Sequence, residues 1–154
     1  MRERNVAQRA FDEFGRDAGF EKKSGSWYRL GKEVTVVLNL QKSQYGPRYY
    51  LNVGFWFCEL GDTRYPKDNM CHIVVRLEGL LPAADEQIQK LLDLGREMID
   101  EQRMLELRTL LNKELLPLIE RGSSIAGLRQ MLADGMLEHA GIRGPAQLLL
   151  ASTR

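Results

Sequence analysis

The sequence has few of the residues from which metal sites are built. Its 154 residues include two histidines and two cysteines, and no HxH, HExxH or CxxC pattern occurs. Protein-bound zinc and iron need clustered histidine, cysteine or carboxylate ligands, so we expect no metal and no cofactor. The glycine-rich loops GxGxxG and GxxxxGKS/T are missing as well, so no loop of this kind is expected to bind a nucleotide phosphate.

Long hydrophobic runs are also lacking. None approaches the roughly 20 apolar residues of a membrane helix, and the N-terminal segment MRERNVAQRAFDEFGRD has no apolar stretch of the signal-peptide kind. We therefore expect a cytoplasmic protein with no membrane partner. In that reducing compartment Cys58 and Cys71 are expected to be free thiols, because strand alternation places them on opposite faces of a sheet.

Neither sign of charge dominates the chain, whose net charge is +1 at pH 7. The protein as a whole is therefore not built for non-specific attraction to nucleic acid or to an anionic membrane. Residues 1–50 carry ten Lys/Arg against six Asp/Glu, and residues 51–154 carry twelve against fifteen. Residues 85–106 hold seven acids and three bases. Ordinary solvated faces explain this distribution, and so does an acidic surface for a basic partner such as a nuclease.

The sequence does contain a helical period at both ends and a strand period between them. With 44% hydrophobic and 28% charged residues, it is typical of one soluble globular domain over residues 1–154. A helix is predicted over 3–17, followed by a turn-rich connection. Strands are predicted over about 26–30, 33–41, 48–58 and 72–78. Further helices are predicted over about 84–116 (as one helix or as two divided at Gly95), over 124–134 after a Ser123 or Ser124 cap, and over 145–151 near Pro145.

The short connections between these strands predict a four-stranded antiparallel meander on which the C-terminal helices pack, an α+β fold. Matching faces across the second and third strands gives their register. The apolar face carries Val34, Val36, Leu38 and Leu40 with Tyr49, Leu51, Val53, Phe55 and Phe57. The opposite, polar face carries Thr35, Val37, Asn39 and Gln41 with Arg48, Tyr50, Asn52, Gly54 and Trp56, and receives His72 and Arg76 from the fourth strand.

Asparagine is depleted in strands, so two asparagines at the centres of neighbouring strands call for an explanation. Amides both donate and accept hydrogen bonds, and an arginine beside them can hold a carboxylate or phosphate through two bonds. One interpretation is a recognition face made of Asn39, Gln41, Ser43, Arg48, Tyr50, Asn52, Trp56, His72 and Arg76. The alternative is an internal polar layer beneath the C-terminal chain. Burial of Asn39 and Asn52 distinguishes the two.

Short segments in the same region carry a resemblance to a known family. GFEKK, WYR, NLQKS, YYLNVG and HIVVRLEGL follow one another before a helical tail. Over roughly residues 9–135 this order resembles a bacterial family known as domain of unknown function 4304, with matching positions at Asn39, Gln41, Ser43, Asn52 and Gly54. The resemblance implies no activity, and the tryptophan-containing segment expected after the last strand is missing from PAADEQIQKLL. Families of this size and style often accompany toxin genes as immunity proteins.

Enzymatic alternatives are confined to a few side chains. Cys71 and His72 are neighbours, but adjacent residues of a regular strand point to opposite faces, so a nucleophile–base pair is not expected. Glu59, Asp62 and Asp68 surround one loop, where they could form an acid–base pair or be solvated without a catalytic role. A weak alternative is an enzyme that uses His72 together with the polar face.

Single-stranded nucleic-acid binding is a second class of function, since a sheet with aromatic and basic side chains can stack unpaired bases. The residues available are Arg2, Arg4, Arg9, Arg16, Lys22, Lys23, Lys42 and Arg48, with Trp27, Tyr28, Tyr45 and Tyr50. The leading expectation is a non-catalytic binding module with a protein partner. Its sharpest form is an immunity-type protein that neutralises a toxin.

Overall fold

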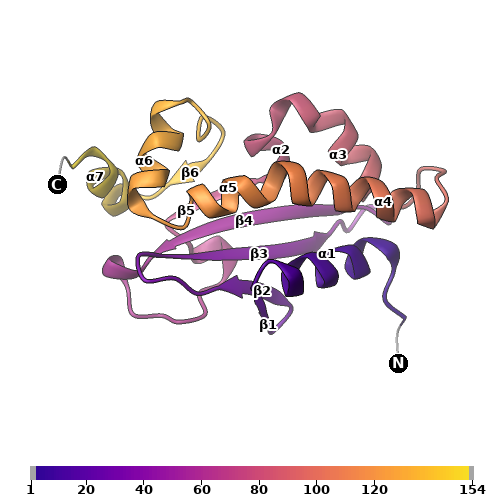
Figure 1. Ribbon diagram of the computed structural model, residues 1–154, viewed down its shortest axis with the longest axis horizontal. Helices are drawn as coiled ribbons and strands as arrows, with labels where there is room; N and C mark the ends of the chain where they lie inside the picture. Colours follow the sequence, from indigo (N-terminus) through magenta and orange to yellow (C-terminus); the bar gives the residue numbers. More distant parts are fainter. Residues whose placement is uncertain (1–2, 153–154) are drawn as a thin grey trace.

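Six antiparallel strands form one sheet, and helices cover one of its two faces (Figure 1). The computed structural model describes residues 3–152, so Arg2 lies outside the described residues. The strands are adjacent in chain order: β1 (Glu21–Lys23), β2 (Ser26–Arg29), β3 (Val34–Lys42), β4 (Tyr49–Phe57), β5 (Ile73–Arg76) and β6 (Gly141–Ile142). The helices are α1 (Val6–Asp17), α2 (Leu77–Leu80), α3 (Asp85–Leu92), α4 (Asp100–Leu110), α5 (Leu116–Arg121), α6 (Ile125–Ala133) and α7 (Gly144–Ala151). The predicted α+β class is confirmed.

The prediction of four strands was wrong, because short strands extend both edges of the sheet. β1 lies in the segment predicted as a connection and pairs with β2 across Ser24 and Gly25, whose φ angles are 52° and 84°. Two consecutive residues with positive φ are typical of a type I′ hairpin turn. Every β1 residue is exposed, so no hydrophobic alternation marks this strand. β6 has two residues, paired with β5 through Ile142 and Gly141, and is too short to show a period.

The predicted faces of the central hairpin are confirmed. Val36 pairs with Phe55, and Leu38 pairs with Val53. All four side chains are buried against the helices. Because side chains alternate along a strand, this register also fixes which residues meet on the opposite face.

The first helix begins later than predicted because Asn5 caps it. The Asn5 side chain accepts a hydrogen bond from the Gln8 backbone N–H, and the Gln8 side chain accepts one from the Asn5 backbone N–H. This capping box satisfies two N–H groups that the first helical turn leaves free. α1 therefore starts at Val6 rather than at residue 3, and its apolar stripe, which includes Phe11 and Phe14, is buried against the sheet.

The region predicted as one or two helices over 84–116 is divided. α3 ends at Leu92 and α4 begins at Asp100, with Gly95 in the connection, so the acidic stripe over 85–106 is interrupted. Beyond α4 the helix continues through one π-helical turn, Leu111–Leu115, into α5. Pro117 follows this turn. Proline lacks an N–H to donate and its ring clashes with a carbonyl one turn earlier, and the wider π turn accommodates both effects.

Arg103 holds the connection between α3 and α4. Its side chain is 2% exposed, and the guanidinium donates to four backbone carbonyls at distances of 2.8–3.2 Å. The acceptors are the carbonyls of Lys90, Leu91, Asp93 and Arg96. These groups lie in the last turn of a helix and just after it, where no further helical N–H can reach them.

The starts of the last two helices agree with the sequence signals. The Ser124 hydroxyl accepts a hydrogen bond from the Gly127 N–H and caps α6. Gly135 follows this helix with a φ of 80°, a conformation that glycine adopts without steric cost. Pro145 lies in the first turn of α7, where its missing N–H has no helical partner to lose.

Cys58 and Cys71 are both free thiols, as expected. The reason given for this was wrong, however. β5 starts at Ile73, so Cys71 precedes the strand and packs with Tyr28 and Val37 on the polar face rather than on the helical face. Within residues 3–152, every helix is too short or too polar to cross a bilayer.

Candidate functional site

A row of four polar side chains crosses the sheet on the face opposite the helices. Ser26 of β2 pairs with Asn39 of β3. Asn39 in turn pairs with Asn52 of β4, which pairs with Arg76 of β5. Gln41 and Tyr50 face each other two residues further along the same strands. We call these six side chains the amide face: Ser26, Asn39, Gln41, Tyr50, Asn52 and Arg76.

Hydrogen bonds hold the amides of this face in place without enclosing them. Asn39 Nδ2 donates to Ser26 Oγ at 3.0 Å, and Asn52 Nδ2 donates to Gln41 Oε1 at 2.9 Å. Both asparagines are half-buried, and Gln41 is exposed. Within the part of the chain that the structure describes, neither asparagine Oδ1 accepts a hydrogen bond, so each retains acceptor capacity for an outside group. The amides thus bond to their neighbours and also face outward.

An arginine and a tyrosine stack at one end of this row. The Arg76 guanidinium lies over the Tyr50 ring, 4.0 Å from its centroid. Such a cation–π contact contributes about 0.5–1 kcal/mol at an exposed site. Arg76 is exposed, and its strand position is opposite Asn52.

The other half of the polar face lies beneath the loop between β4 and β5. Trp56 Nε1 donates to the Gly61 carbonyl at 3.3 Å, and the Trp56 ring packs against His72 with centroids 4.3 Å apart. His72 is buried, and its Nδ1 accepts a hydrogen bond from the Phe57 N–H at 2.9 Å. Burial lowers the pKa of His72, and the charge of Arg143 lowers it further. We therefore leave His72 and Trp56 out of the site.

Two other members of the predicted recognition face serve elsewhere. Ser43 is buried, and its Oγ accepts a hydrogen bond from the Tyr45 N–H in the turn after β3. Arg48 is exposed and lines a separate cavity together with residues of α3. The amide face therefore contains five of the nine predicted residues and adds Ser26, which sequence reasoning left as an ordinary strand residue.

The catalytic alternatives receive no support from these positions. Cys71 is completely buried, and its burial raises the pKa of the thiol to about 12, so the reactive thiolate is scarce at neutral pH. Glu59 and Asp68 line different cavities. Among residues 3–152 no cluster of three or more His, Cys, Asp or Glu side chains is arranged to hold a metal ion.

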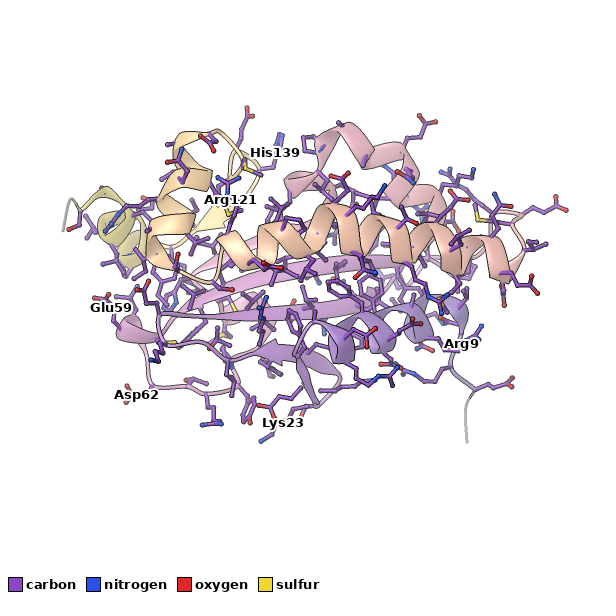
Figure 2. All side chains as sticks on the ribbon, in the orientation of Figure 1. Arg9, Lys23, Glu59, Asp62, Arg121 and His139 are labelled. Carbon is purple, nitrogen blue, oxygen red and sulfur yellow. The ribbon has the colours of Figure 1, made fainter. Side chains whose placement is uncertain are left out.

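A cavity of about 480 Å³ opens beside the amide face and shares Ser26 and Asn39 with it. We call it the basic cavity, because its lining has three cationic side chains, Lys23, Arg64 and Lys67, and a single acid, Asp68. The rest of its wall comes from Ser24, Tyr28, Thr63 and Tyr65. Lys23 and Asp62 lie on the side of the molecule away from Arg121 and His139 (Figure 2). The site therefore lies opposite the helical layer.

The cations of the basic cavity are held by an aromatic ring. Lys23 Nζ and the Arg64 guanidinium lie 4.1 Å and 5.7 Å from the centroid of the Tyr65 ring. The Tyr65 hydroxyl donates to Glu21 at 2.9 Å, which ties the loop to β1. Sequence reasoning missed Arg64, Tyr65 and Lys67 because their segment has only the composition of an exposed loop. No local signal indicates that this loop folds back over the sheet.

Comparison with known families supports the resemblance seen in the sequence. Comparison with the curated proteins and with the solved structures gave no match. Residues 11–121 match the family described as Domain of unknown function (DUF4304), a range that runs from within α1 to the end of α5. The match includes the amide face and the basic cavity and covers most of the chain. The chain therefore belongs to the DUF4304 family.

Proposed function

We propose that this protein is a non-catalytic binding module that recognises a protein partner through the amide face and the basic cavity beside it. The observation that carries the proposal is the row in which Asn39 and Asn52 lie opposite each other, uncovered by helices and fixed by hydrogen bonds. Fixed side chains lose little conformational entropy when a partner binds, so their remaining donors and acceptors contribute more fully to affinity.

The side chains of the amide face favour a protein partner over single-stranded nucleic acid. Tyrosine and arginine, here Tyr50 and Arg76, are enriched among residues that dominate protein–protein binding energy. Base stacking needs a free aromatic face. Arg76 already lies over the Tyr50 ring, and Lys23 and Arg64 lie near the Tyr65 ring, so cations compete with any stacked base.

The charge of the basic cavity indicates which surface of a partner would fit. Three cationic side chains face one carboxylate in it, and Arg76 adds a further positive charge on the amide face. Opposite potentials steer association and oppose partners of the wrong charge. We therefore propose that the partner presents acidic side chains here, and that an immunity-type role would consist of covering an acidic surface of a toxin.

The test is affinity capture from the native host's lysate with matched variants. We compare the wild type with Asn39→Ala/Asn52→Ala and with a control, Gln87→Ala/Asn112→Ala, which removes two exposed amides from the helical layer. Each lost hydrogen bond costs roughly 0.5–1.5 kcal/mol of stability, so the folding of each variant is confirmed by its unfolding transition. We expect one protein to be retained stoichiometrically by the wild type and the control and lost by the Asn39/Asn52 variant.

Two results would contradict the proposal. One is equal retention of the captured protein by the Asn39/Asn52 variant. The other is recovery of nucleic acid alone, which is released steeply as the salt concentration is raised.

The immunity-type role is tested separately by expressing the captured protein. It should arrest growth alone, and co-expression of the wild type, but not of Asn39→Ala/Asn52→Ala, should restore growth.

A further inference from the structure

A second, smaller cavity lies where β4 begins and α3 ends. Its volume is about 200 Å³, and its polar lining comes from Arg48, Tyr50, Glu78, Gln89, Asp93 and Arg96. The Leu94 N–H donates to the Pro47 carbonyl at 2.8 Å, and Arg48 forms a β-bridge with Asp93. These backbone contacts join the strand to the segment after α3, so the walls of the cavity are held together without a ligand.

Two opposite charges in this cavity, those of Glu78 and Arg48, lack partners among residues 3–152. Glu78 Oε1 is buried and has no hydrogen-bond partner among the described residues. The Arg48 side chain likewise makes no hydrogen bond or ion pair with any residue of the described range. The other pair of charges is satisfied locally, since Arg96 Nε lies 3.6 Å from Asp93 Oδ2 and Asp93 Oδ1 accepts from the Gly95 N–H. A buried carboxylate oxygen without a donor is costly and is rare in folded proteins.

The size of the cavity limits what could fill it. At about 200 Å³ the cavity is well above the size that admits a single water, so it has room for a small organic molecule. Cavities that enclose drug-sized ligands measure about 300–1,000 Å³. Nucleotides and peptides are therefore too large. Ile88 and Leu92 provide an apolar wall against which a short aliphatic group can pack.

We propose that this cavity binds a small free α-amino acid. The ligand's ammonium group donates to Glu78, which supplies the donor that the buried oxygen lacks. Its carboxylate accepts from the Arg48 guanidinium, for which a planar carboxylate is a matched two-bond partner. Gln89 Nε2 is engaged with Asp85 Oδ1, which leaves its own carbonyl oxygen able to accept from a polar ligand side chain. This cavity is separate from the basic cavity and shares Tyr50 with the amide face, and its proposed ligand does not depend on the identity of the protein partner.

The experiment titrates the folded, full-length protein with each of the twenty free L-amino acids and follows binding by NMR chemical shifts and calorimetry. At least one small amino acid should bind, whereas its methyl ester and its N-acetyl derivative, each lacking one of the two charges, should bind at least tenfold more weakly. Glu78→Gln and Arg48→Gln should each weaken binding tenfold or more, the effect expected when a hydrogen bond to a charged group is lost. Glu86→Gln, an exposed acid at the start of α3, is the control and should leave affinity unchanged.

The proposal is overturned if none of the amino acids, at about 10 mM, shifts the resonances of residues that line the cavity. This concentration is about tenfold above the upper end of typical KM values for small substrates. In that case the cavity holds water only. It is also overturned if the ester and the N-acetyl derivative bind as tightly as the parent amino acid. This comparison uses only the wild-type protein, so it decides the matter even where a Glu78 variant fails to fold.

Discussion

Replacing Gly54 with alanine tests how the loop between β4 and β5 is held against the polar face. Gly54 is buried at the centre of β4, opposite Val37. A Cβ atom at this position would lie 2.7 Å from Cys71 Sγ, 3.0 Å from Cys71 Cβ and 3.3 Å from the Asp68 carbonyl oxygen. Non-bonded carbon atoms prefer about 3.5–4.0 Å. The added methyl group therefore cannot fit unless the strand or the loop moves.

The size of the effect follows from two opposing contributions. Extra methyl groups in a well-packed site typically cost about 1–3 kcal/mol. Alanine in a strand interior regains about 0.5–1 kcal/mol relative to glycine, because it has less backbone entropy to lose. From the middle of each range, the net expectation is a loss of about 1 kcal/mol in the free energy of unfolding. For a chain of this length each kcal/mol shifts Tm by about 2–4 °C, so Gly54→Ala should lower Tm by about that amount.

The assay is a double-mutant cycle measured by denaturant unfolding of the wild type, Gly54→Ala, Cys71→Ala and the double variant. Cys71→Ala removes the sulfur that the new methyl group would meet, so the double variant should be more stable than the sum of the single effects by about 1 kcal/mol. Gly46→Ala is the control, because a Cβ there would meet nothing within 4 Å. A Gly54→Ala protein as stable as the wild type, or strict additivity in the cycle, would refute the packing argument.

Three further predictions concern groups buried by the tertiary fold. Arg103→Met should lower the free energy of unfolding by about 2–4 kcal/mol, because it leaves the carbonyls after α3 without donors. Chemical denaturation measures this loss. The control is Arg108→Met, which removes an exposed ion pair and should cost about 1 kcal/mol or less. Cys71, whose pKa burial raises to about 12, should resist iodoacetamide at pH 8 until the protein unfolds, and peptide mass spectrometry showing labelling as fast as at Cys58 would contradict this. Burial lowers the pKa of His72 below its usual 6.5, so on acidification the unfolded chain binds the proton before the folded protein does. The contribution of neutral His72 to the free energy of unfolding is therefore fully present above pH 6.5. It falls as the pH is lowered from 6.5 towards the pKa of the folded state. His72→Gln should flatten that part of the Tm–pH profile, and an unchanged profile would show that other groups cause the slope.

Much of the sheet could be predicted from the sequence because strand faces depend on local alternation. Val36 and Leu38 alternate with Val37 and Asn39, and the partner strand alternates in the same way. A slip of one residue would turn both apolar sets away from the core, so the residues themselves place Asn39 and Asn52 on one face, and the structure pairs them. The Ser124 cap and the place of Pro145 are equally local, since each depends on backbone groups within one turn.

Contacts between distant segments decided the rest. Exposed β1 and two-residue β6 form by pairing with an existing sheet edge, which leaves no period in their own residues. The loop carrying Arg64 and Tyr65 folds back over the polar face, so it divides residues that the sequence grouped together and buries His72 while Asn39 and Asn52 stay accessible. The partners of Arg103 and the cavity beside Arg48 likewise arise from segments brought together by packing. The sequence by itself determined which side chains share a face, because alternation along a strand is a local property of the chain. Only the tertiary structure decided what covers each face, because burial depends on residues far away in the sequence.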